Sequence, residues 1–423
     1  MHLHGLNIPD LFLSLWRGTM QCDPEDDKGT WDWMVLIDEV WSKHGEDVAR
    51  ATQYLPGCFD KPPRNPAERM NSGYKAQEYI TWLYVLGPAL LRGILPDKFW
   101  KHFCKLVRAL RLIWERKQPR EHLLEAHRLL CEAEEEFEKL YYQRKSSRLH
   151  FCRQSIHALL HIVPEIIRVG PGGYRSQWTL ERTIGNIGEE IKQHSNAYAN
   201  LAQRGKRRCQ VNALKAMLPS LDSSRKGPPQ GALDLQNGYI LSPARDEFVQ
   251  TVEGAYGKAI SQYLEEEEGQ TANEGWKPAV RRWARLELPN GQVLRSLWKE
   301  SKMDELRIAR NIKVQIYGDI LYAEVQFFFQ AAIQKTNEEH TLALVSVYSA
   351  PDPELLQESF QTVAQCEYCG EESLEIINIT QIQSGVAMIP IGEEEEGMHF
   401  VGEKLGLDIE SMGGAREEMD EDP

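Results

Sequence analysis

No run of 18 or more apolar residues occurs in this sequence of 423 residues, so the sequence predicts no membrane-spanning helix. The opening segment MHLHGLNIPDLFLSLWRG lacks the basic start of a secretory leader, and Asp10 interrupts its one apolar run. We therefore expect an intracellular protein without a membrane partner.

Cysteines are few and scattered: the chain has eight, and only Cys366 and Cys369 have the CxxC spacing. One such pair supplies half of a structural zinc site, and no second pair follows to complete it. We expect reduced thiols rather than a disulfide framework or a zinc site. The sequence also lacks a P-loop, a GxGxxG motif, an internal repeat, and any recognisable zinc-finger or helix–turn–helix pattern.

Positive charge is in deficit, with a formal net charge of −14, which argues against a dedicated nucleic-acid-binding protein. The charge is uneven, however, because residues 92–128 and 204–208 are rich in Arg and Lys. Acidic residues gather at 132–138, 265–268, 393–396 and the end of the chain. Average charge therefore does not decide the class of partner.

Residues 1–218 have mostly helical patterning. Apolar residues of 97–117 recur on one helical face: Phe99, Phe103, Leu106, Val107, Leu110, Ile113 and Trp114. After Pro119 a second such pattern follows, which predicts an antiparallel helical hairpin with solvated charged outer faces. A third helix with Ile156 and Val163 is expected to end near Pro164, and a fourth to begin close to Ser176.

The rest of the chain divides by composition. Residues 219–280 are predicted to form a linker with a short helix and an acidic loop. Residues 281–392 contain an Asn-Gly hairpin signal and the strand-like runs IKVQIYG, ILYAEVQFFF, TLALVSVYS, LEIINIT and VAMIPI. Short strands at this density predict a small closed barrel. Residues 393–423 are predicted to be an acidic disordered tail, which makes the chain an α+β multidomain protein.

Three segments of residues 1–218 resemble fungal transposases of the CACTA group, also called Tnp-type. They are MHLHGLNIPDLFLSLWRG, then GYKAQEYITWLYVLGPALLRGILPDKFWKHFCKLVRALRLI, and SIHALLHIVPEIIRVGPGGYRSQWTLERTIGNIGEEIKQHSNAYANLAQRGKRRCQVNALKAMLP. The resemblance implies an RNase H-like core, incomplete here, with the family's helical insertion. The β-rich end is similar to a barrel-type tail that many members carry, and no activity is attached to it.

The resemblance also implies a three-carboxylate site for Mg²⁺ in full-length members, where two ions promote phosphodiester cleavage. The first two aspartates of that site would lie upstream of this sequence. The second of them would precede Met1 by two residues, so that His2 matches the histidine of the family's Asp-x-x-His pattern. Glu181 in TLERTIG matches the third acid. Since Mg²⁺ needs several hard oxygen ligands, Glu181 is a metal ligand only if the missing aspartates are supplied, and we expect no cofactor for this chain alone.

The spacing around Glu181 is compatible with two roles. Gly185 and Gly188 lie on the same helical side as Glu181, where a nucleic-acid backbone or a metal could approach a strip without side chains. The glycines could instead let a neighbouring helix pack, with Glu181 at the rim.

Basic residues near Glu181 are candidate DNA-binding residues because lysine and arginine neutralise phosphates without reading sequence: Arg175, Lys192, Arg204, Lys206, Arg207 and Arg208. A solvated surface or a nuclear-import patch would explain the same cluster.

Two other groups contain residue types that can bind metals. His157 and His161 lie four residues apart, a spacing that can bind zinc, but Ala158 stands where an HExxH motif has glutamate. Their apolar neighbours favour hydrogen-bonded core or interface histidines. Asp10, Asp38 and Glu39 lie in amphipathic contexts and are expected to be surface acids rather than replacements for the lost aspartates.

Two functions remain open from the sequence. The first is a transposon-derived protein resembling the C-terminal part of a CACTA transposase, a family of metal-dependent enzymes, in a catalytically incomplete form. The second is a non-catalytic module that binds DNA or chromatin proteins. Either function predicts a nuclear location. The first predicts DNA as a partner, with self-association or pairing with a full-length transposase, and the second predicts DNA or a chromatin protein.

Overall fold

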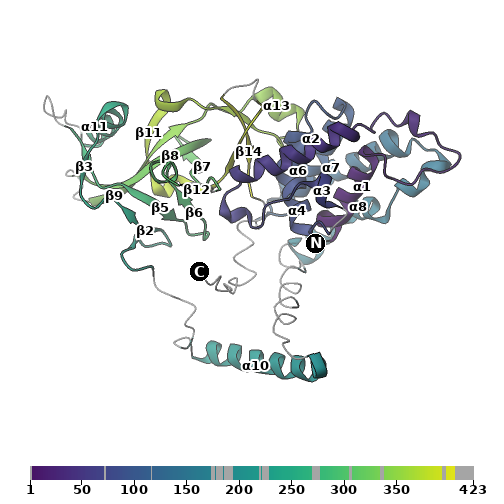
Figure 1. The fold of residues 1–423 in the computed structure, drawn as a ribbon, viewed down its shortest axis with the longest axis horizontal. Helices are drawn as coiled ribbons and strands as arrows, with labels where there is room; N and C mark the ends of the chain where they lie inside the picture. The colour runs from purple at the N-terminus through teal and green to yellow at the C-terminus, as the bar shows by residue number, and fades with distance from the viewer. Residues whose placement is uncertain are drawn as a thin grey trace.

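The computed structural model describes residues 2–70, 73–115, 117–172, 177, 184, 194–218, 221, 228–268, 277–303, 307–333, 338–392 and 397–404. Figure 1 shows a helical lobe (residues 2–172), a β lobe (residues 228–404) and one helix, α10, that lies apart from both. The prediction of an α+β chain with a helical N-terminal region is confirmed. Among the described residues, no helix combines the length and apolarity needed to cross a membrane.

The helical lobe is built on a buried aromatic core. Its helices are α1 (Ile8–Trp16), α2 (Asp38–Ala51), α3 (Pro66–Arg69), α4 (Ala76–Thr81), α5 (Gly87–Leu90), α6 (Asp97–Leu112), α7 (Arg120–Phe137) and α8 (Gln154–Val169). Trp16, Trp82 and Phe103 pack edge to face or tilted in this core, and the Trp16 indole N–H donates to the Tyr141 hydroxyl at 3.0 Å. Each buried aromatic side chain contributes a large apolar area, so this core dominates the stability of the lobe.

The predicted helical hairpin is confirmed as α6 and α7. Its charged faces are not simply solvated, which corrects the prediction: Lys105 of α6 bonds to Glu132 and Glu136 of α7, at 3.1 and 2.5 Å. Arg108 pairs with Glu125 at 3.0 Å in the same way. The basic run of α6 and the acidic run of α7 therefore neutralise one another across the hairpin.

We predicted that helix α8 ends near Pro164, but it continues to Val169 with Pro164 inside it. The buried side chain of Ile166 continues the apolar stripe past the proline. Gly170, with a φ of 91°, then ends the helix, since this left-handed conformation costs glycine little.

The β lobe contains the predicted strands. Together with strands that the sequence did not predict, they are β1 (Leu233–Asp234), β2 (Ile240–Arg245), β3 (Gln250–Thr251), β4 (Ala279–Val280), β5 (Trp283–Glu287), β6 (Val293–Arg295), β7 (Asn311–Ile316), β8 (Asp319–Ile333), β9 (Glu338–Val347), β10 (Gln365–Glu367), β11 (Leu374–Asn378), β12 (Ile382–Gly385), β13 (Ala387–Pro390) and β14 (Met398–Gly402). The predicted ones are β5, β6, β7, β8, β9, β11 and β13. Among the described residues of this lobe, three α-helices accompany the strands: α11 (Gly254–Glu268), α12 (Leu297–Glu300) and α13 (Pro353–Glu358).

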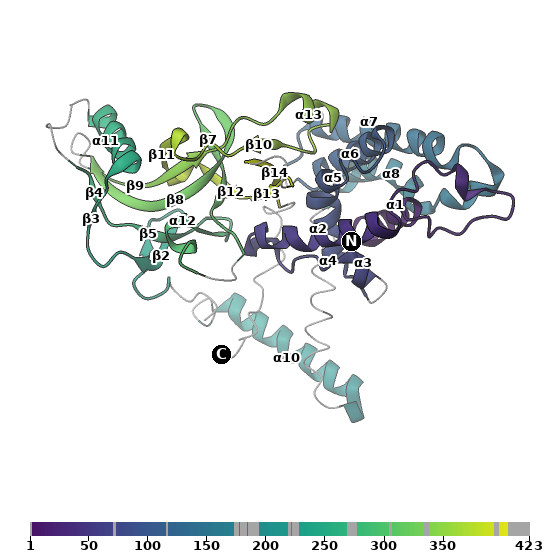
Figure 2. The same ribbon diagram turned by 45° about the horizontal axis from the view of Figure 1, so that its top comes forward.

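The predicted closed barrel is wrong, because the main sheet is open. Its strands run in the order β1-β2-β5-β8-β7-β12, and β9 and β11 extend from the other edge of β8. In the described part of the chain, no pairing joins β12 to β11. Both faces of β8 are buried, with Phe328 in one core and Phe327 and Phe329 in a second core under α11 (Figure 2). Helix α11 covers the face of the sheet that carries Phe327 and Phe329.

Two boundaries also need correction. The predicted linker 219–280 contains strand β2, which pairs antiparallel with β5 and so belongs to the main sheet. The predicted disordered tail 393–423 contains strand β14, which pairs with β10 and β13. Phe400 of β14 and Ile389 of β13 are buried in the core of the helical lobe.

The two lobes are joined by polar contacts as well as this core. The Arg307 guanidinium donates to the backbone carbonyls of Leu55, Pro56 and Asp60, at 2.6, 2.6 and 2.7 Å. Arg111 of α6 donates to the Thr362 carbonyl at 2.7 Å. A guanidinium has five N–H donors in a fixed fork, so one side chain can hold several carbonyls of a loop.

Candidate functional site

The sequence-predicted site residues fall into three places. Glu181, Arg175 and Lys192 lie outside the described residues. His2 is exposed, directly before the helical turn that leads into α1. The remaining candidates lie on α8 and α10.

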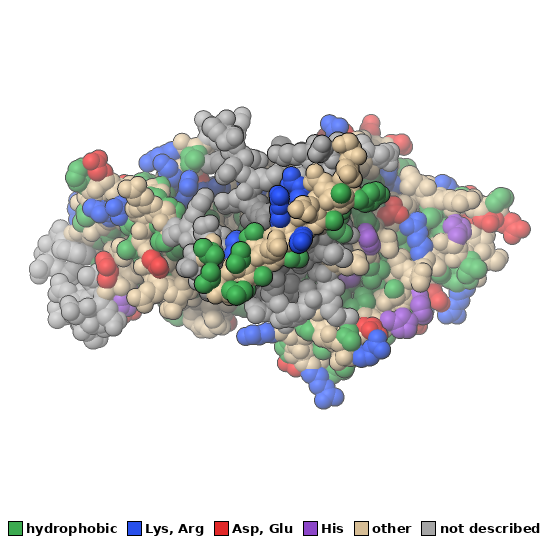
Figure 3. Space-filling model, turned by 90° about the horizontal axis from the view of Figure 1, so that it is seen from below, with side chains coloured by type: hydrophobic (Ala, Val, Ile, Leu, Met, Phe, Trp, Pro, Cys, Tyr) green, Lys and Arg blue, Asp and Glu red, His purple; other side chains and the backbone are tan. Residues whose placement is uncertain are grey.

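Helix α10 (Ala197–Met217) carries the basic cluster. Lys206 and Arg207 are exposed, whereas Arg204 and Arg208 are half-exposed, and none of its residues is buried. Its 21 residues contain no aspartate or glutamate, and they span about 31 Å at the usual helical rise. Figure 3 shows Lys and Arg side chains near the middle of this helix and hydrophobic side chains toward its ends. The helix thus presents concentrated positive charge on a protein that is otherwise acidic.

Four of these cations share one side of α10. Arg207 and Arg208 follow Arg204 at spacings of three and four residues, and Lys215 continues the same side two turns later. The Arg204 Nε donates to the Asn200 side chain at 2.9 Å, which orients the first guanidinium. Lys206 lies on the opposite side. An anionic surface in contact with α10 would therefore meet cations along its length.

The histidines of α8 are not core residues, which corrects one of the two positions predicted for them; an interface position stays a prediction. His157 and His161 are both exposed, and their Nε2 atoms lie 3.0 Å apart. The two rings are nearly perpendicular, at 75°, with centroids 4.8 Å apart. The opposite side of α8 is buried through Ile156, Leu159 and Val163, so the histidine side of the helix faces solvent.

A buried histidine that the sequence reading did not select lies close by. The Nδ1 atom of His4 accepts a hydrogen bond from the Trp114 indole N–H at 2.8 Å and lies 2.7 Å from the Tyr84 hydroxyl. Burial lowers the pKa of His4 to about 3, so its ring is neutral. Because Nδ1 accepts from an indole that can only donate, the ring proton belongs on Nε2. A signal existed, since His4 shares one helical face with Ile8, Leu11 and Leu15, all of them buried.

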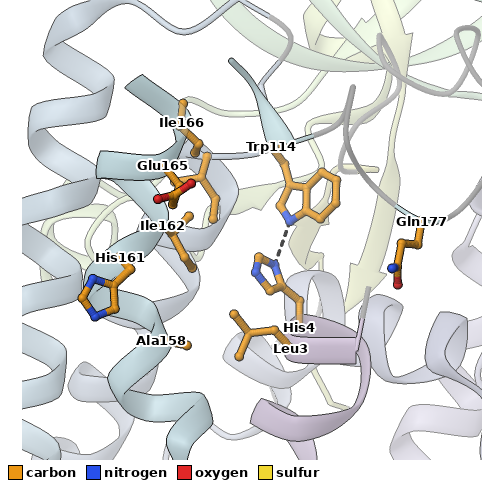
Figure 4. A pocket seen from close by; sticks show the side chains of 11 residues that line it. Leu3, His4, Trp114, Ala158, His161, Ile162, Glu165, Ile166 and Gln177 are labelled. Atoms are coloured by element: carbon orange, nitrogen blue, oxygen red, sulfur yellow. Dashed lines mark hydrogen bonds between the residues drawn. The ribbon is translucent and has the colours of Figure 1, made fainter. Parts of the chain in front are cut away.

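His4 lines a pocket of about 420 Å³ between the start of the chain and α8 (Figure 4). Its walls are mostly apolar, and its polar members are His4, His161, Glu165 and Gln177. In Figure 4 the ring of His161 points away from the His4–Trp114 pair, toward the outside of α8. The ring of His161 therefore lies with His157 at the surface of α8 rather than beside His4.

The other weighed acids are surface groups, as expected. Asp10 pairs with Arg153 at 2.7 Å on the exposed side of α1, and Asp38 and Glu39 are exposed at the start of α2. Among the described residues, no three His, Cys, Asp or Glu side chains converge into a group that could hold a metal ion. Cys366 and Cys369 are free thiols.

Comparison with known proteins finds no match: no family model, no curated protein and no solved structure is similar to this chain.

Proposed function

We propose that this chain is a transposon-derived protein related to CACTA transposases, catalytically incomplete, that binds the DNA backbone through α10. The observation that carries the proposal is the composition and exposure of α10, with Lys206 and Arg207 exposed and no acid between Ala197 and Met217. DNA carries a phosphate every 1.7 Å of its axis, so cations within one helical turn can each meet a phosphate.

Cations of this kind support affinity rather than sequence reading. Lysine and arginine that meet phosphates position a protein on a duplex, whereas sequence is read by contacts to base edges. A chromatin protein could use the same helix through an acidic segment. We favour DNA because the cations of α10 are distributed along one side rather than concentrated in a single pocket.

The catalytic part of the proposal concerns carboxylates. Two-ion cleavage of a phosphodiester needs several oxygen ligands around each ion. Within these 423 residues the family resemblance identifies one matching acid, Glu181. We therefore expect that the chain binds DNA without cleaving it. The proposal includes an incomplete RNase H-like core in this chain.

Salt dependence of binding to a labelled duplex tests the DNA-binding part. If α10 neutralises four phosphates, log K should fall with log salt with a slope of about −3.6, or about 150-fold between 50 and 200 mM salt. The Arg207→Gln/Arg208→Gln variant removes two of the four cations that share one side of α10. Its slope should be about −1.8, with a loss of only about 12-fold over the same range.

A matched control is Arg144→Gln/Lys145→Gln, which removes two neighbouring exposed cations from the helical lobe. This control should keep the wild-type slope. An unchanged slope in the α10 variant, or an equal reduction in the control, would show that α10 is not the DNA surface. Absence of binding at 50 mM salt would reject DNA as the partner.

Incubation of the same duplex with Mg²⁺ or Mn²⁺ tests the catalytic part. We expect intact DNA with the wild-type chain. Metal-dependent nicking that Glu181→Gln abolishes would contradict the proposed incompleteness and leave the binding result unaffected.

A further inference from the structure

The exposed histidine pair of α8 has the geometry of a chelate. We propose that His157 and His161 form a surface binding site for a divalent transition-metal ion, with Cu²⁺ bound most tightly and Ni²⁺ and Zn²⁺ less so. The proposal rests on the Nε2–Nε2 distance of 3.0 Å and on the exposure of both rings. It is independent of the proposed DNA binding, which concerns α10.

The distance between the nitrogens selects the coordination geometry. Metal–imidazole bonds are about 2.05 Å long, so two nitrogens 3.0 Å apart subtend an angle of about 94° at one shared ion. That angle suits neighbouring positions of an octahedral or tetragonal ion, as Ni²⁺ and Cu²⁺ prefer. A tetrahedral ion such as Zn²⁺ requires a wider angle and therefore a separation of about 3.3 Å.

The helix holds the two rings in place before an ion arrives. Residues four apart are neighbours on a helix surface, and α8 is fixed to the lobe by the buried side chains of Ile156, Leu159 and Val163. At 3.0 Å one Nε2 already accepts a hydrogen bond from the other, so both nitrogens point into the space between the rings. When an ion binds, the donating histidine carries its proton on Nδ1 instead of Nε2, so both Nε2 atoms coordinate as neutral imidazoles without a change in the backbone.

The identity of the ligands excludes Mg²⁺ as the preferred ion. Imidazole nitrogen suits Cu²⁺, Ni²⁺ and Zn²⁺, whereas Mg²⁺ is bound by carboxylate and water oxygens. Glu165, the next residue on this side of α8, is 2.8 Å from Arg168 and is half-exposed. The site therefore has two protein ligands, and water completes the coordination shell, which predicts an ion that exchanges readily.

Copper binding to the full chain tests the proposal by two readouts. Titration calorimetry with Cu²⁺ gives the affinity, and electron paramagnetic resonance counts the imidazole nitrogens on the bound copper. The wild-type chain should show two nitrogens on one copper site. His157→Ala and His161→Ala should each leave one nitrogen and weaken binding by about 100-fold, because each removes the second arm of a chelate.

Three further variants separate this site from other histidines. His150→Ala removes an exposed histidine whose ring bonds to the Gln21 carbonyl, and His2→Ala removes the exposed histidine near the chain start. Both should keep the two-nitrogen signal. His157→Ala combined with Glu165→His restores a histidine four residues from His161, so this variant should regain two nitrogens and most of the affinity.

All of these positions are exposed or half-exposed, so circular dichroism should show a folded chain in each case. A wild-type spectrum with fewer than two imidazole nitrogens would overturn the proposal. Equal affinity of wild type and His157→Ala/His161→Ala would overturn it as well, and so would a failure of the Glu165→His combination to regain the signal.

Discussion

Acid should destabilise the helical lobe at an unusually high pH, because three of its histidines are buried in neutral form. Burial lowers the pKa of His4 to about 3 and those of His44 and His102 to about 4. His44 accepts at Nε2 from the Trp82 indole N–H at 3.0 Å, as His4 accepts from Trp114. A proton on either accepting nitrogen would face an indole hydrogen, so the hydrogen bonding opposes protonation together with burial.

The sign and size follow from linkage. Unfolded histidine has a pKa of about 6.5, so below this pH the unfolded chain binds protons that the folded chain does not. The free energy of unfolding therefore falls as pH drops from about 6.5 toward 4. Between pH 7.5 and pH 5 each histidine should cost about 2 kcal/mol, and the three together about 6 kcal/mol. This is a large part of the stability of an ordinary domain.

Urea unfolding followed by tryptophan fluorescence at pH 7.5, 6.5, 5.5 and 5.0 measures this slope. In His44→Gln the amide oxygen can accept from Trp82 but does not titrate, so the slope should fall by about 1.4 kcal/mol per pH unit. Val48→Ala, one turn further along α2 and fully buried, is a matched control. It should lower stability by about 2 kcal/mol at every pH with the wild-type slope. The reasoning would be refuted by a wild-type slope below about 1.4 kcal/mol per pH unit, the value for one proton. Equal slopes in wild type and His44→Gln would refute it as well.

Two further predictions concern arginine side chains that join distant segments of the chain. Arg148 is fully buried and bonds to Asp26 at 2.7 and 2.8 Å, so Asp26→Asn should cost about 3 to 5 kcal/mol in urea unfolding at pH 7. Because Arg148 lowers the pKa of Asp26 to about 2, this difference should shrink as pH falls from about 4 to about 2, and a loss below 1 kcal/mol at pH 7 would contradict it. Arg307→Gln removes donors to three carbonyls of the helical lobe and should accelerate hydrogen exchange of the Ile308 amide, which bonds to Gln53, by about 30-fold or more. Exchange within β8 should not change, and an unaltered Ile308 rate would show that Arg307 does not hold the lobes together.

Local patterns predicted the elements of this fold well. The α6–α7 hairpin followed from apolar residues at helical spacing, and β7, β8, β9, β11 and β13 followed from β-branched and aromatic runs. These patterns depend on neighbours within one element. For the same reason, they did not predict which helix or strand packs against a given face of another element.

The errors concern contacts between distant segments. An open sheet and a closed barrel share the same strand patterns, because the pairing of the edge strands that distinguishes them is a contact between distant segments. The insertion of β13 and β14 into the helical core depends on residues about 300 positions from α6 in the chain. Likewise, the apolar neighbours of His157 and His161 suggested burial, but the direction of α8 against the lobe decides which side of the helix faces solvent.

Charge distribution determines how DNA would approach this protein. The five cations of α10 belong to a chain with a net charge of −14, so the remainder carries a net charge of −19. Charges on the lobes repel a duplex at distances within about 10 Å at 0.1 M salt, whereas α10 attracts it. Added salt weakens both the repulsion by the lobes and the attraction by α10, so the absolute affinity for DNA reflects the two together. The difference in slope between wild type and Arg207→Gln/Arg208→Gln cancels the shared repulsion, and it is therefore the quantity that measures contact between α10 and phosphate.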